Sequence, residues 1–541
     1  MLDIFILAAG TIRKKIHFLK YIYDSPALIP INTEPIAGAV IKFYRQKVTN
    51  AKLHLAVNDD VLNIVQRYLS VYENDINIIA INNKGGVINT LRDVIYKVNP
   101  TGVIIVNLVT TIPSVVPRNN EVLVAEEHAI SNEWSSVQDN GIKVNFNFKE
   151  SVVEKKGNAF TGVFCVSTKL LIKALSQLDD NKSHDLLYVV EEIHKRKKLA
   201  FKKVQWMDCG HEMNYYKAKI NLISSRSFNS IEVDSIKGTL RKRSNYHKTL
   251  KDEIDFILHL PKELSIYFPR VLKKPDSNDH ISEVEMEYYG YPSLSEYMLF
   301  WDLNKGLWAN VFNALTTVIK DFQKYKSPKI TRQDYLNFYW GKTYNRLCNF
   351  KSQLGEKDLI FSDKLSINEK QYKNIHLLEK EIVNKLTIMY NNSVFNIMHG
   401  DLCFNNILYD LYSGTIRLID ARGSFGDKMA GIYGDQCYDI AKISHSVIGG
   451  YDYIVNGFFS FEEKNNTYKY WIFERMNHKS LIDLNVNLIE YFGYNITDVM
   501  FFMSLLFISM TPLHNDNINR QKLFYLHGIR FLNESLGILK I

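Results

Sequence analysis

The first part of the chain alternates short apolar runs with stretches of helical spacing. Runs of strand length occupy residues 4–10, 53–57, 76–81 and 103–106, and apolar positions recur with a helical period over residues 36–46. Short buried strands that alternate with helices predict an α/β sheet with parallel strands. We therefore expect an α/β domain over residues 1–220.

A different pattern follows, over residues 221–290. Residues 230–233, 238–244 and 284–289 have strand character, and between the second and third of them an apolar stripe recurs at helical spacing, at Leu250, Ile254, Ile257 and Leu258. Short strands with one amphipathic helix predict a small α+β lobe.

The remainder, residues 291–541, is dominated by helical spacing. Apolar stripes of helical period cover residues 299–325, 335–350, 375–390 and 482–536. Two short β-like runs, 406–409 and 415–419, flank a turn that contains Gly414, which predicts a β-hairpin within an otherwise helical lobe.

Composition limits the compartment and the partners. The chain has 541 residues, which predicts about two to four domains. Its net charge of +8 is modest for this length and permits nucleotides as ligands, and no dense Lys/Arg block indicates nucleic acid. Five scattered cysteines without a Cys-x-x-Cys pair argue against zinc and disulfides, which fits a reducing, cytoplasmic location. The apolar run at residues 499–510 is too short to span a bilayer, so we expect no membrane span.

Residues 399–420 hold the strongest chemical signal. The sequence His-Gly-Asp ends at Asp401, Asn406 opens the hairpin, and Asp420 follows its second strand. A hairpin brings Asn406 and Asp420 to the same end of the strand pair, where an amide oxygen and a carboxylate can share Mg²⁺. Asp401, on the loop before the hairpin, can accept the proton of an attacking hydroxyl, and His399 is expected to orient that loop. These groups suit phosphoryl transfer from Mg-ATP.

The same residues resemble the catalytic signature of the choline kinase and aminoglycoside phosphotransferase superfamily. The resemblance implies a bilobal protein-kinase-like fold, with Asp401 as catalytic base and Asn406 and Asp420 as Mg²⁺ ligands. Asp420-Ala421-Arg422 departs from the Asp-Phe-Gly of protein kinases. Downstream, Asp435 and Asp439 also fit the superfamily pattern, and we expect them to act as a helix cap and a loop anchor.

The small lobe supplies candidates for the ATP site. Lys242 is the expected phosphate-binding lysine, and Glu253 its partner, as the superfamily's lysine–glutamate pair implies. Glu287 and Tyr288 lie in a segment that resembles the adenine-binding hinge, and Ser227 lies in a small polar loop that can cover phosphates. Two alternatives remain: an exposed Glu253, and a different lysine or arginine at the phosphates, namely Lys237, Arg241 or Arg243.

Four further residues concern the acceptor of the phosphoryl group. Lys342 and Arg346 lie on the helix of residues 335–350 and can reach a substrate cleft, although a solvated helix face is the simpler interpretation. His514 and Asp516 interrupt the last helical region and are a candidate substrate contact or a polar loop.

Residues 1–220 resemble the sugar nucleotidyltransferases. The matching pieces are Leu7-Ala8-Ala9-Gly10, residues 25–32, Glu154-Lys155 and Trp206-Met207-Asp208-Cys209-Gly210. The resemblance implies a nucleotide or sugar site that includes Ala9, Gly10, Lys155 and Asp208.

The departures from that family concern its metal site. Val109-Thr110 stands where active relatives carry Gly-Asp, and Pro26 replaces an expected lysine. A threonine hydroxyl is a poor ligand for a hard cation, so Asp208 would be left as the one carboxylate. We expect a degenerate domain that binds a nucleotide or sugar, or positions the second domain. Lys14 and Lys15 can still neutralise phosphate.

Together these patterns predict three segments: residues 1–220, nucleotidyltransferase-like; 221–290, a kinase-like small lobe and hinge; and 291–541, a helical large lobe. The expected activity is ATP- and Mg²⁺-dependent phosphorylation of a hydroxyl on a sugar, polyol or choline-like amino alcohol, in the supply of surface polysaccharide precursors. Two alternatives are a bifunctional kinase and nucleotidyltransferase, and a non-catalytic nucleotide-binding scaffold. The sequence leaves the acceptor and the oligomeric state undetermined.

Overall fold

The computed structural model describes residues 2–10, 25–82, 85–128, 134–148, 157–179, 184–223, 229–273, 283–327, 330–354, 358–425, 431–475 and 478–538. The chain divides into two compact units. Unit 1 comprises Met1–Leu222 with Phe300–Asp302, and unit 2 comprises Ile223–Leu299 with Leu303–Ile541.

Unit 1 is built on a nine-stranded sheet. Four parallel strands stand in the order β5-β4-β1-β6, namely Asn77–Ile81, Ala51–Asn58, Leu2–Leu7 and Val103–Leu108. They confirm the parallel arrangement predicted from the alternation of strands and helices. The other strands are β8 (Glu121–His128), β9 (Ser136–Asp139), β10 (Val144–Asn147), β11 (Asn158–Ser167) and β12 (Ala200–Val204).

The sheet as a whole is mixed, which the apolar pattern did not indicate. Strand β11 runs antiparallel to β6, to β8 and to β9. Parallel neighbours need a crossover connection of a dozen or more residues, whereas antiparallel strands can follow one another through short turns. The shorter links β9–β10 and β10–β11 therefore favour the antiparallel half.

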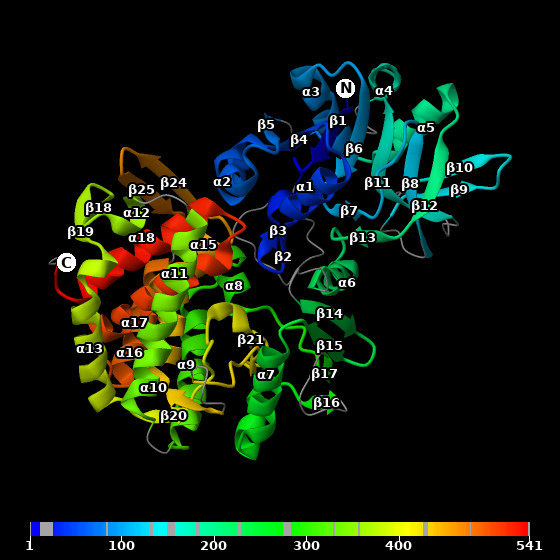
Figure 1. Cartoon of the computed structure of the whole chain (residues 1–541). Helices are drawn as coiled ribbons and strands as arrows, with labels where there is room; N and C mark the ends of the chain where they lie inside the picture. The colour runs from blue at the N-terminus through cyan, green and yellow to red at the C-terminus, as the bar shows by residue number, and fades with distance from the viewer. Residues whose placement is uncertain are drawn as a thin grey trace. The chain divides into compact units, whose positions relative to one another are not determined.

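Helices cover this sheet and complete the core of unit 1. Helix α3 packs against β1 and β5 (Figure 1). Its side chains Leu91 and Val94 are fully buried. The helices of unit 1 are α1 (Ile36–Lys47), α2 (Leu62–Tyr68), α3 (Val87–Val98), α4 (Thr168–Leu175), α5 (Leu187–Arg196) and α6 (Glu212–Ile223), and short strands are β2 (Pro30–Ile31), β3 (Glu34–Pro35), β7 (Thr111–Pro113) and β13 (Trp206–Asp208).

Unit 2 begins with a four-stranded antiparallel sheet in the order β14-β15-β17-β16, namely Asn229–Asp234, Thr239–Ser244, Glu283–Glu287 and Val271–Lys273. Helix α7 (His247–His259) packs Leu250 and Ile254 against Val284 and Met286. The predicted stripe is wrong at its end, because Leu258 is exposed. Glu253 is instead buried on the inner face of this helix.

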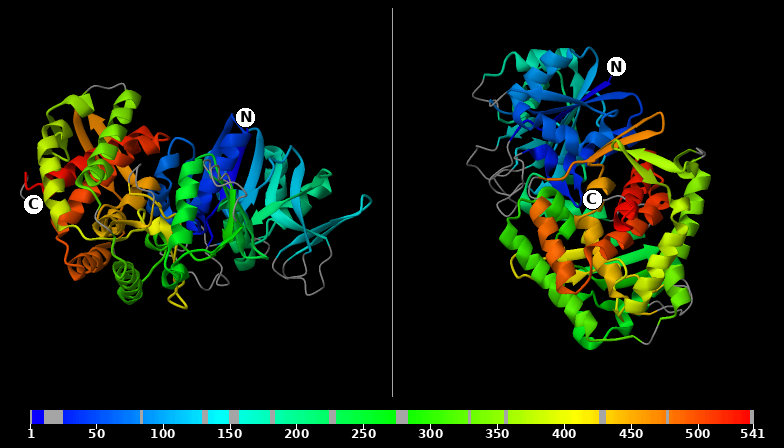
Figure 2. Two further views of the ribbon diagram at one scale, coloured as in Figure 1. Left: turned by 60° about the horizontal axis from the view of Figure 1, so that its bottom comes forward. Right: turned by 90° about the vertical axis from the view of Figure 1, so that its left-hand side faces the viewer.

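The rest of unit 2 is mostly helical, as expected. Helices α17 and α18 lie side by side in the orange and red part of the chain (Figures 1 and 2). The helices are α8 (Leu294–Phe300), α9 (Lys305–Gln323), α10 (Arg332–Leu336), α11 (Lys342–Leu354), α12 (Asp358–Phe361), α13 (Glu379–Asn392), α14 (Gln436–Val447), α15 (Tyr451–Val455), α16 (His478–Tyr491), α17 (Ile496–Met510) and α18 (Ile518–Ser535).

Two features of this region differ from expectation. A second four-stranded sheet, β19-β18-β25-β24, is formed by Lys370–Lys373, Lys364–Ile367, Thr467–Ile472 and Phe459–Lys464. The helical segment that begins with α17 also continues to His514. The segment Ile496–His514 has 19 residues and is long and apolar enough to cross a membrane. Because 67% of its apolar window is buried inside the unit, it has the surroundings of a core helix.

The predicted hairpin is confirmed. Strands β21 (Ile407–Tyr409) and β22 (Ile416–Leu418) pair antiparallel. A short two-stranded pair, β20 (Phe395–Ile397) with β23 (Tyr433–Asp435), lies on either side of it in the sequence. Strand β20 thus leads into the loop that carries Asp401.

Candidate functional site

Asp439 fixes the backbone of the loop that carries Asp401. Asp439 lies on α14, where it is 1% exposed, and its two carboxylate oxygens accept the backbone N–H groups of His399 and Gly400 at 2.7 and 2.8 Å. Gly400 has φ +79°, a conformation that favours glycine. The prediction that Asp439 anchors a loop is confirmed.

Asp435 also has the predicted role. It is the N-cap of α14, and its carboxylate accepts the N–H of Cys437 at 3.0 Å. The hydroxyls of Tyr335 and Tyr339 donate to the same carboxylate. These contacts fix the start of the buried helix that presents Asp439 to the loop.

His399 holds the loop as well. The N–H of Asp401 donates to His399 Nδ1 at 3.2 Å, so this ring nitrogen acts as an acceptor. The ring is buried and stacks on Phe268 at 5.9 Å between centroids. Burial lowers the pKa of His399 to about 4, which keeps the imidazole neutral. The geometry is that of an orienting group.

Asp401 is in contact with an amide and a cation. Asn406 donates its Nδ2 to the carbonyl oxygen of Asp401 at 2.9 Å and to Oδ2 at 3.0 Å. Lys442 places its Nζ 2.7 Å from Asp401 Oδ1. Burial alone would favour the neutral acid, but the charge of Lys442 and its hydrogen bond lower the pKa of Asp401. Its side chain remains 41% exposed, so one face is accessible.

Sequence reasoning missed Lys442. Its own ammonium is buried, which opposes a charge, yet Asp401 outweighs this effect and raises the pKa of Lys442. A signal for it existed: Lys442 lies three residues after Asp439, on the same face of a helix whose position relative to the loop was already expected.

Asp420 meets the small lobe through Lys242. The Nζ of Lys242 lies 2.7 Å from Asp420 Oδ1 and 2.6 Å from Glu253 Oε2. Asp420 has φ +58°, and its side chain is 51% exposed. Residues 242, 253 and 420 therefore come together although up to 178 positions separate them in sequence.

The alternation of side chains along strand β15 explains why Lys242, and not a neighbouring cation, lies beside Glu253 and Asp420. Successive side chains of a strand point to opposite faces, so Lys242 faces α7 and is 8% exposed. Arg241 and Arg243 point to the other face and pair with exposed carboxylates such as Glu283. Lys237 pairs with Asp234 in the turn before the strand. Lys237, Arg241 and Arg243 therefore have solvated positions, which was the alternative to a role at the phosphates.

The two carboxylates beside Lys242 differ in burial, since Glu253 is buried and Asp420 is half exposed. Burial raises the pKa of Glu253 to about 7; the charge of Lys242 opposes this effect and that of Asp420 adds to it. Burial opposes the charge of Lys242, but the carboxylates of Asp420 and Glu253 together raise its pKa. The ammonium is thus held charged between a buried acid and an exposed one.

Asn406 and Asp420 offer two oxygen donors at one end of the hairpin, and their binding of Mg²⁺ stays a prediction. The N–H of Ile419 donates to the carbonyl oxygen of Asn406 at 3.1 Å, which keeps Asn406 and Asp420 at the same end of the hairpin. Because Asn406 uses its Nδ2 toward Asp401, its amide oxygen is directed away from that carboxylate. An amide oxygen and an accessible carboxylate are hard oxygen ligands of the kind that Mg²⁺ takes alongside phosphate oxygens.

Both hinge candidates, Glu287 and Tyr288, have hydrogen-bond partners within unit 2. Glu287 pairs with Arg270 and accepts from the hydroxyl of Tyr289, so its side chain is engaged at the end of β17. Tyr288 donates its N–H to the carbonyl of Gly238 at 2.9 Å, and burial raises the pKa of its phenol to about 12. Adenine contacts at these positions stay a prediction. Ser227 lies outside the described residues.

His514 and Asp516, the second candidate contact with the acceptor, do not act as a pair. Asp516 forms an ion pair with Arg520 at 3.1 Å, whereas His514 packs its ring on Phe524 at 4.9 Å between centroids. The two side chains thus engage different partners, which agrees with the simpler interpretation of a polar loop.

In unit 1, Asp208 is surrounded by hydrogen-bond donors. It is 4% exposed, its Oδ1 accepts the N–H of Gly210 at 2.9 Å, and its Oδ2 accepts from Trp134 and Asn214 at 3.1 and 3.2 Å. His211 Nδ1 lies 2.7 Å from the same oxygen. A carboxylate with these contacts is poorly available to a cation.

Thr110, the residue found where the resemblance implied a carboxylate, lies close to Asp208. A Cβ at Gly210 would lie 3.3 Å from both Thr110 Oγ1 and Asp208 Oδ1. Among the described residues, no group of three or more His, Cys, Asp or Glu side chains is placed to hold a metal ion. A Cβ at Gly10 would meet no heavy atom of the described residues within 4 Å, and Ala9 follows β1. Lys155, Lys14 and Lys15 lie outside the described residues.

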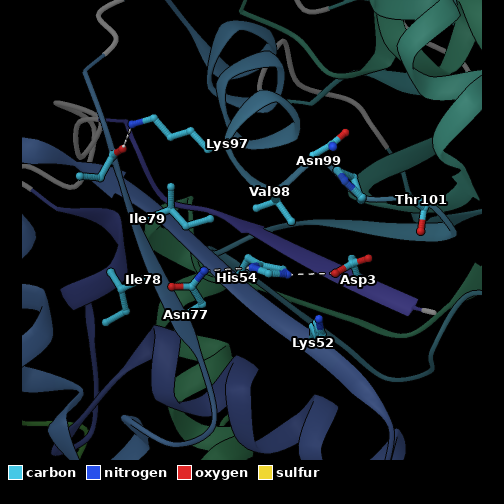
Figure 3. Close-up of a pocket in the computed structure, with 12 residues that line it drawn as sticks. Asp3, Lys52, His54, Asn77, Ile78, Ile79, Lys97, Val98, Asn99 and Thr101 are labelled. Atoms are coloured by element: carbon cyan, nitrogen blue, oxygen red, sulfur yellow. Dashed lines mark hydrogen bonds and ion pairs between the residues drawn. The ribbon is translucent and has the colours of Figure 1, made fainter.

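A cavity of about 570 Å³ in unit 1 lies elsewhere on the sheet. Its lining residues Asp3, Lys52 and Asn77 start the parallel strands β1, β4 and β5. Figure 3 shows His54 between Asp3 and Asn77, with His54 Nε2 3.0 Å from Asp3 Oδ1. Ligands of open α/β sheets bind at the carboxyl ends of the strands, so this cavity is not the expected nucleotide crevice.

Comparisons with known proteins find similarity only to solved structures, and the similar part is less than half of the chain. No protein-family model matches the chain. No curated protein matches it either. Solved structures similar to it include a protein assigned as a glucose-1-phosphate thymidylyltransferase from Bacillus anthracis, with 15% identity over 42% of this chain and 97% of that one and a TM-score of 0.36. A UDP-glucose pyrophosphorylase has 12% identity over 42% of this chain and all of its own, with a TM-score of 0.34. An inositol-1-phosphate CTP transferase from T. maritima has 12% identity over 42% and 97%, with a TM-score of 0.33.

Proposed function

We propose that unit 2 is an ATP-dependent phosphotransferase that acts on a hydroxyl of a small polar molecule such as a sugar, a polyol or an amino alcohol. The observation that carries the proposal is the position of Lys242 between Glu253 and Asp420. A buried lysine paired with a helix glutamate, next to an acid that follows a hairpin, is the arrangement that kinases use to hold ATP phosphates and metal.

Each residue then has one role. Lys242 holds phosphate oxygens, Glu253 positions Lys242, and Asn406 with Asp420 provides the oxygen ligands for Mg²⁺. The bound Mg²⁺ would neutralise charge on the phosphates. Asp401 accepts a hydrogen bond from the acceptor hydroxyl and takes its proton during in-line attack. Because Lys442 keeps Asp401 ionised, the carboxylate acts mainly by orienting the hydroxyl, which a loose transition state requires more than a strong base.

For unit 1 we propose a nucleotidyltransferase-like domain that has lost metal-dependent catalysis. Thr110 in place of a carboxylate and the donor-filled surroundings of Asp208 support this. The domain would bind a nucleotide or sugar, in a chain that supplies precursors of surface polysaccharides. The alternative is a bifunctional enzyme, and release of pyrophosphate from a panel of sugar phosphates and nucleoside triphosphates would favour it.

The kinase proposal is tested by ADP formation with Mg-ATP and a panel of hydroxyl compounds. Asp420→Ala should lower kcat by about a thousandfold or more, since it removes a metal ligand and a partner of Lys242. The control is Asp410→Ala, an acid in the turn of the same hairpin whose carboxylate contacts Ser413. Turnover in Asp420→Ala at the level of the control would reject the assignment. An inactive wild-type chain that still binds ATP would favour the scaffold.

A further inference from the structure

Cationic side chains gather beside Asp401. Lys342 and Arg422 share one aromatic ring: their charged ends lie 4.3 and 5.0 Å from the centroid of Phe338. Lys442 is in contact with Asp401 itself. Lys342 and Lys442 lie on α11 and α14, and Arg422 follows the hairpin.

Lys342 is connected to the catalytic loop by a chain of contacts. Its Nζ lies 3.3 Å from the hydroxyl of Tyr438. Tyr438 and Lys442 occupy successive turns of α14, and Lys442 meets Asp401 at 2.7 Å. The stem of Arg422 packs on the loop from the other direction, since a Cβ at Gly400 would lie 2.7 Å from Arg422 Cβ.

The acids near this cluster do not balance it. Asp401 is engaged by Lys442, and Asp439 is buried under the loop with two N–H groups on its carboxylate. Asp252 on α7 lies near Arg422. Among the described residues, no ion pair joins Lys342 to a carboxylate, and its Nζ has the hydroxyl of Tyr438 as its hydrogen-bond partner.

The cluster is costly without a ligand. Burial, and after it the charges of Arg422, Arg346 and Lys442, lower the pKa of Lys342 well below its usual value. The charged ends of Lys342 and Arg422 lie against the same ring, so these like charges repel each other. A bound anion would remove this repulsion, because each cation would gain a counter-charge in a partly desolvated setting.

We propose that the molecule phosphorylated at Asp401 is itself an anion, with a phosphate monoester or carboxylate group bound by Lys342 and Arg422. This inference rests on the proposed kinase function and narrows it. It disfavours a choline-like amino alcohol, because the same cations would repel an ammonium group.

The experiment uses the full chain with Mg-ATP and four acceptors that share one hydroxyl frame: glycerol, glycerol 3-phosphate, glycerate and 3-amino-1,2-propanediol. Binding is measured by calorimetry in the presence of Mg-ADP, and turnover by ADP release. We expect glycerol 3-phosphate or glycerate to bind at least tenfold more tightly than glycerol, and the amine most weakly. Which of the two anions binds better distinguishes phosphate from carboxylate. Absence of a preference for anions, including no binding by any of the four, would overturn the inference.

Variants assign the preference to the cluster. Lys342→Met keeps the stem over Phe338 and should raise the KM of the anionic acceptor by about tenfold to a hundredfold, the loss expected for one charge-assisted hydrogen bond. The KM of ATP should stay unchanged, and a rise in that KM instead would assign the cluster to the nucleotide and contradict the inference. Lys320→Met is the matched control, because Lys320 also lies over an aromatic ring, Tyr491 at 4.6 Å, but on α9.

The two proposals fail separately. An anion preference in calorimetry without ADP release would retain the anion site and reject the kinase. ADP release with glycerol or the amine as the preferred acceptor would retain the kinase and reject the anion site.

Discussion

Replacement of Asp439 by asparagine tests how the loop of Asp401 is held. The carboxylate is 1% exposed and accepts two backbone N–H groups, from His399 and Gly400, one on each oxygen. An asparagine side chain would present one oxygen and one NH₂ group, so one N–H of the loop would face a donor. Asp439→Asn therefore removes one charge-assisted hydrogen bond and leaves a buried donor without an acceptor.

The magnitude follows from these contacts. A hydrogen bond to a charged group contributes about 1.5–3 kcal/mol, and an unsatisfied buried donor costs about 1–3 kcal/mol. We expect the free energy of unfolding to fall by about 2.5–6 kcal/mol. The measurement is made at pH 8, because burial raises the pKa of Asp439 to about 7 and the wild-type carboxylate is charged above it.

Two assays separate a local effect from a global one. Urea denaturation gives the free energy of unfolding, and hydrogen exchange with mass spectrometry gives the protection of the amides of residues 399–401. If the loop opens locally at a cost reduced by about 3 kcal/mol, its exchange should accelerate by roughly a hundredfold. ATP turnover should fall in parallel because Asp401 loses its fixed position.

The control is Asp410→Asn. The carboxylate of Asp410 also accepts two backbone N–H groups, from Tyr412 and Ser413 at 3.1 and 3.3 Å, but in a surface turn where water can replace it. We expect a loss below about 1 kcal/mol there. If Asp439→Asn costs no more than the control and leaves exchange at residues 399–401 unchanged, the anchoring role of Asp439 is wrong.

Two further predictions concern stability. Gly423→Ala should destabilise unit 2 by about 2–4 kcal/mol, because Gly423 has φ +65° and a Cβ there would lie 1.9 Å from the carbonyl oxygen of Asp252. His478 is buried, which lowers its pKa to about 4, so its contribution to stability is complete above about pH 6.5 and is lost as the pH falls toward 4. Between pH 7 and pH 5 the wild type should therefore lose about 2 kcal/mol more than His478→Gln in denaturant titrations.

Each of these two substitutions, Gly423→Ala and His478→Gln, has a matched control. Gly414 has a similar φ of +70°, but a Cβ there would lie 3.6 Å from its nearest neighbour, Tyr409 Oη. Gly414→Ala should therefore cost only about 1 kcal/mol, the cost of the backbone conformation alone. An equal loss at both glycines would contradict the steric argument. The exposed His259 serves as the site for a control His→Gln change. The histidine argument fails if His478→Gln keeps the pH dependence of the wild type.

The hairpin and its flanking acids could be predicted because local patterns specify them. Two short apolar runs on either side of a turn that contains Gly414 specify two paired strands, and turn geometry then brings Asn406 and Asp420 to the same end of the pair. Asp435 was recognisable as a helix cap, since a side-chain oxygen before an apolar helix satisfies a free N–H group.

Other elements required contacts that no local pattern encodes. Strand β18 pairs with β25 about a hundred positions later, and both are short and partly polar, so neither stands out from a helical region. The antiparallel half of the unit 1 sheet depends on which edge of β6 is covered by β11, which apolar runs do not specify.

The sequence by itself determined which chemical groups the candidate site contains and the order in which the hairpin presents them. Only the tertiary structure decided their partners: Lys242 between Glu253 and Asp420, Lys442 on Asp401, and the cations that surround them. The physical reason is that hydrogen bonding and side-chain periodicity act over a few residues. Ion pairing acts through space, so its partners are fixed only when distant segments pack together and water is excluded from between them.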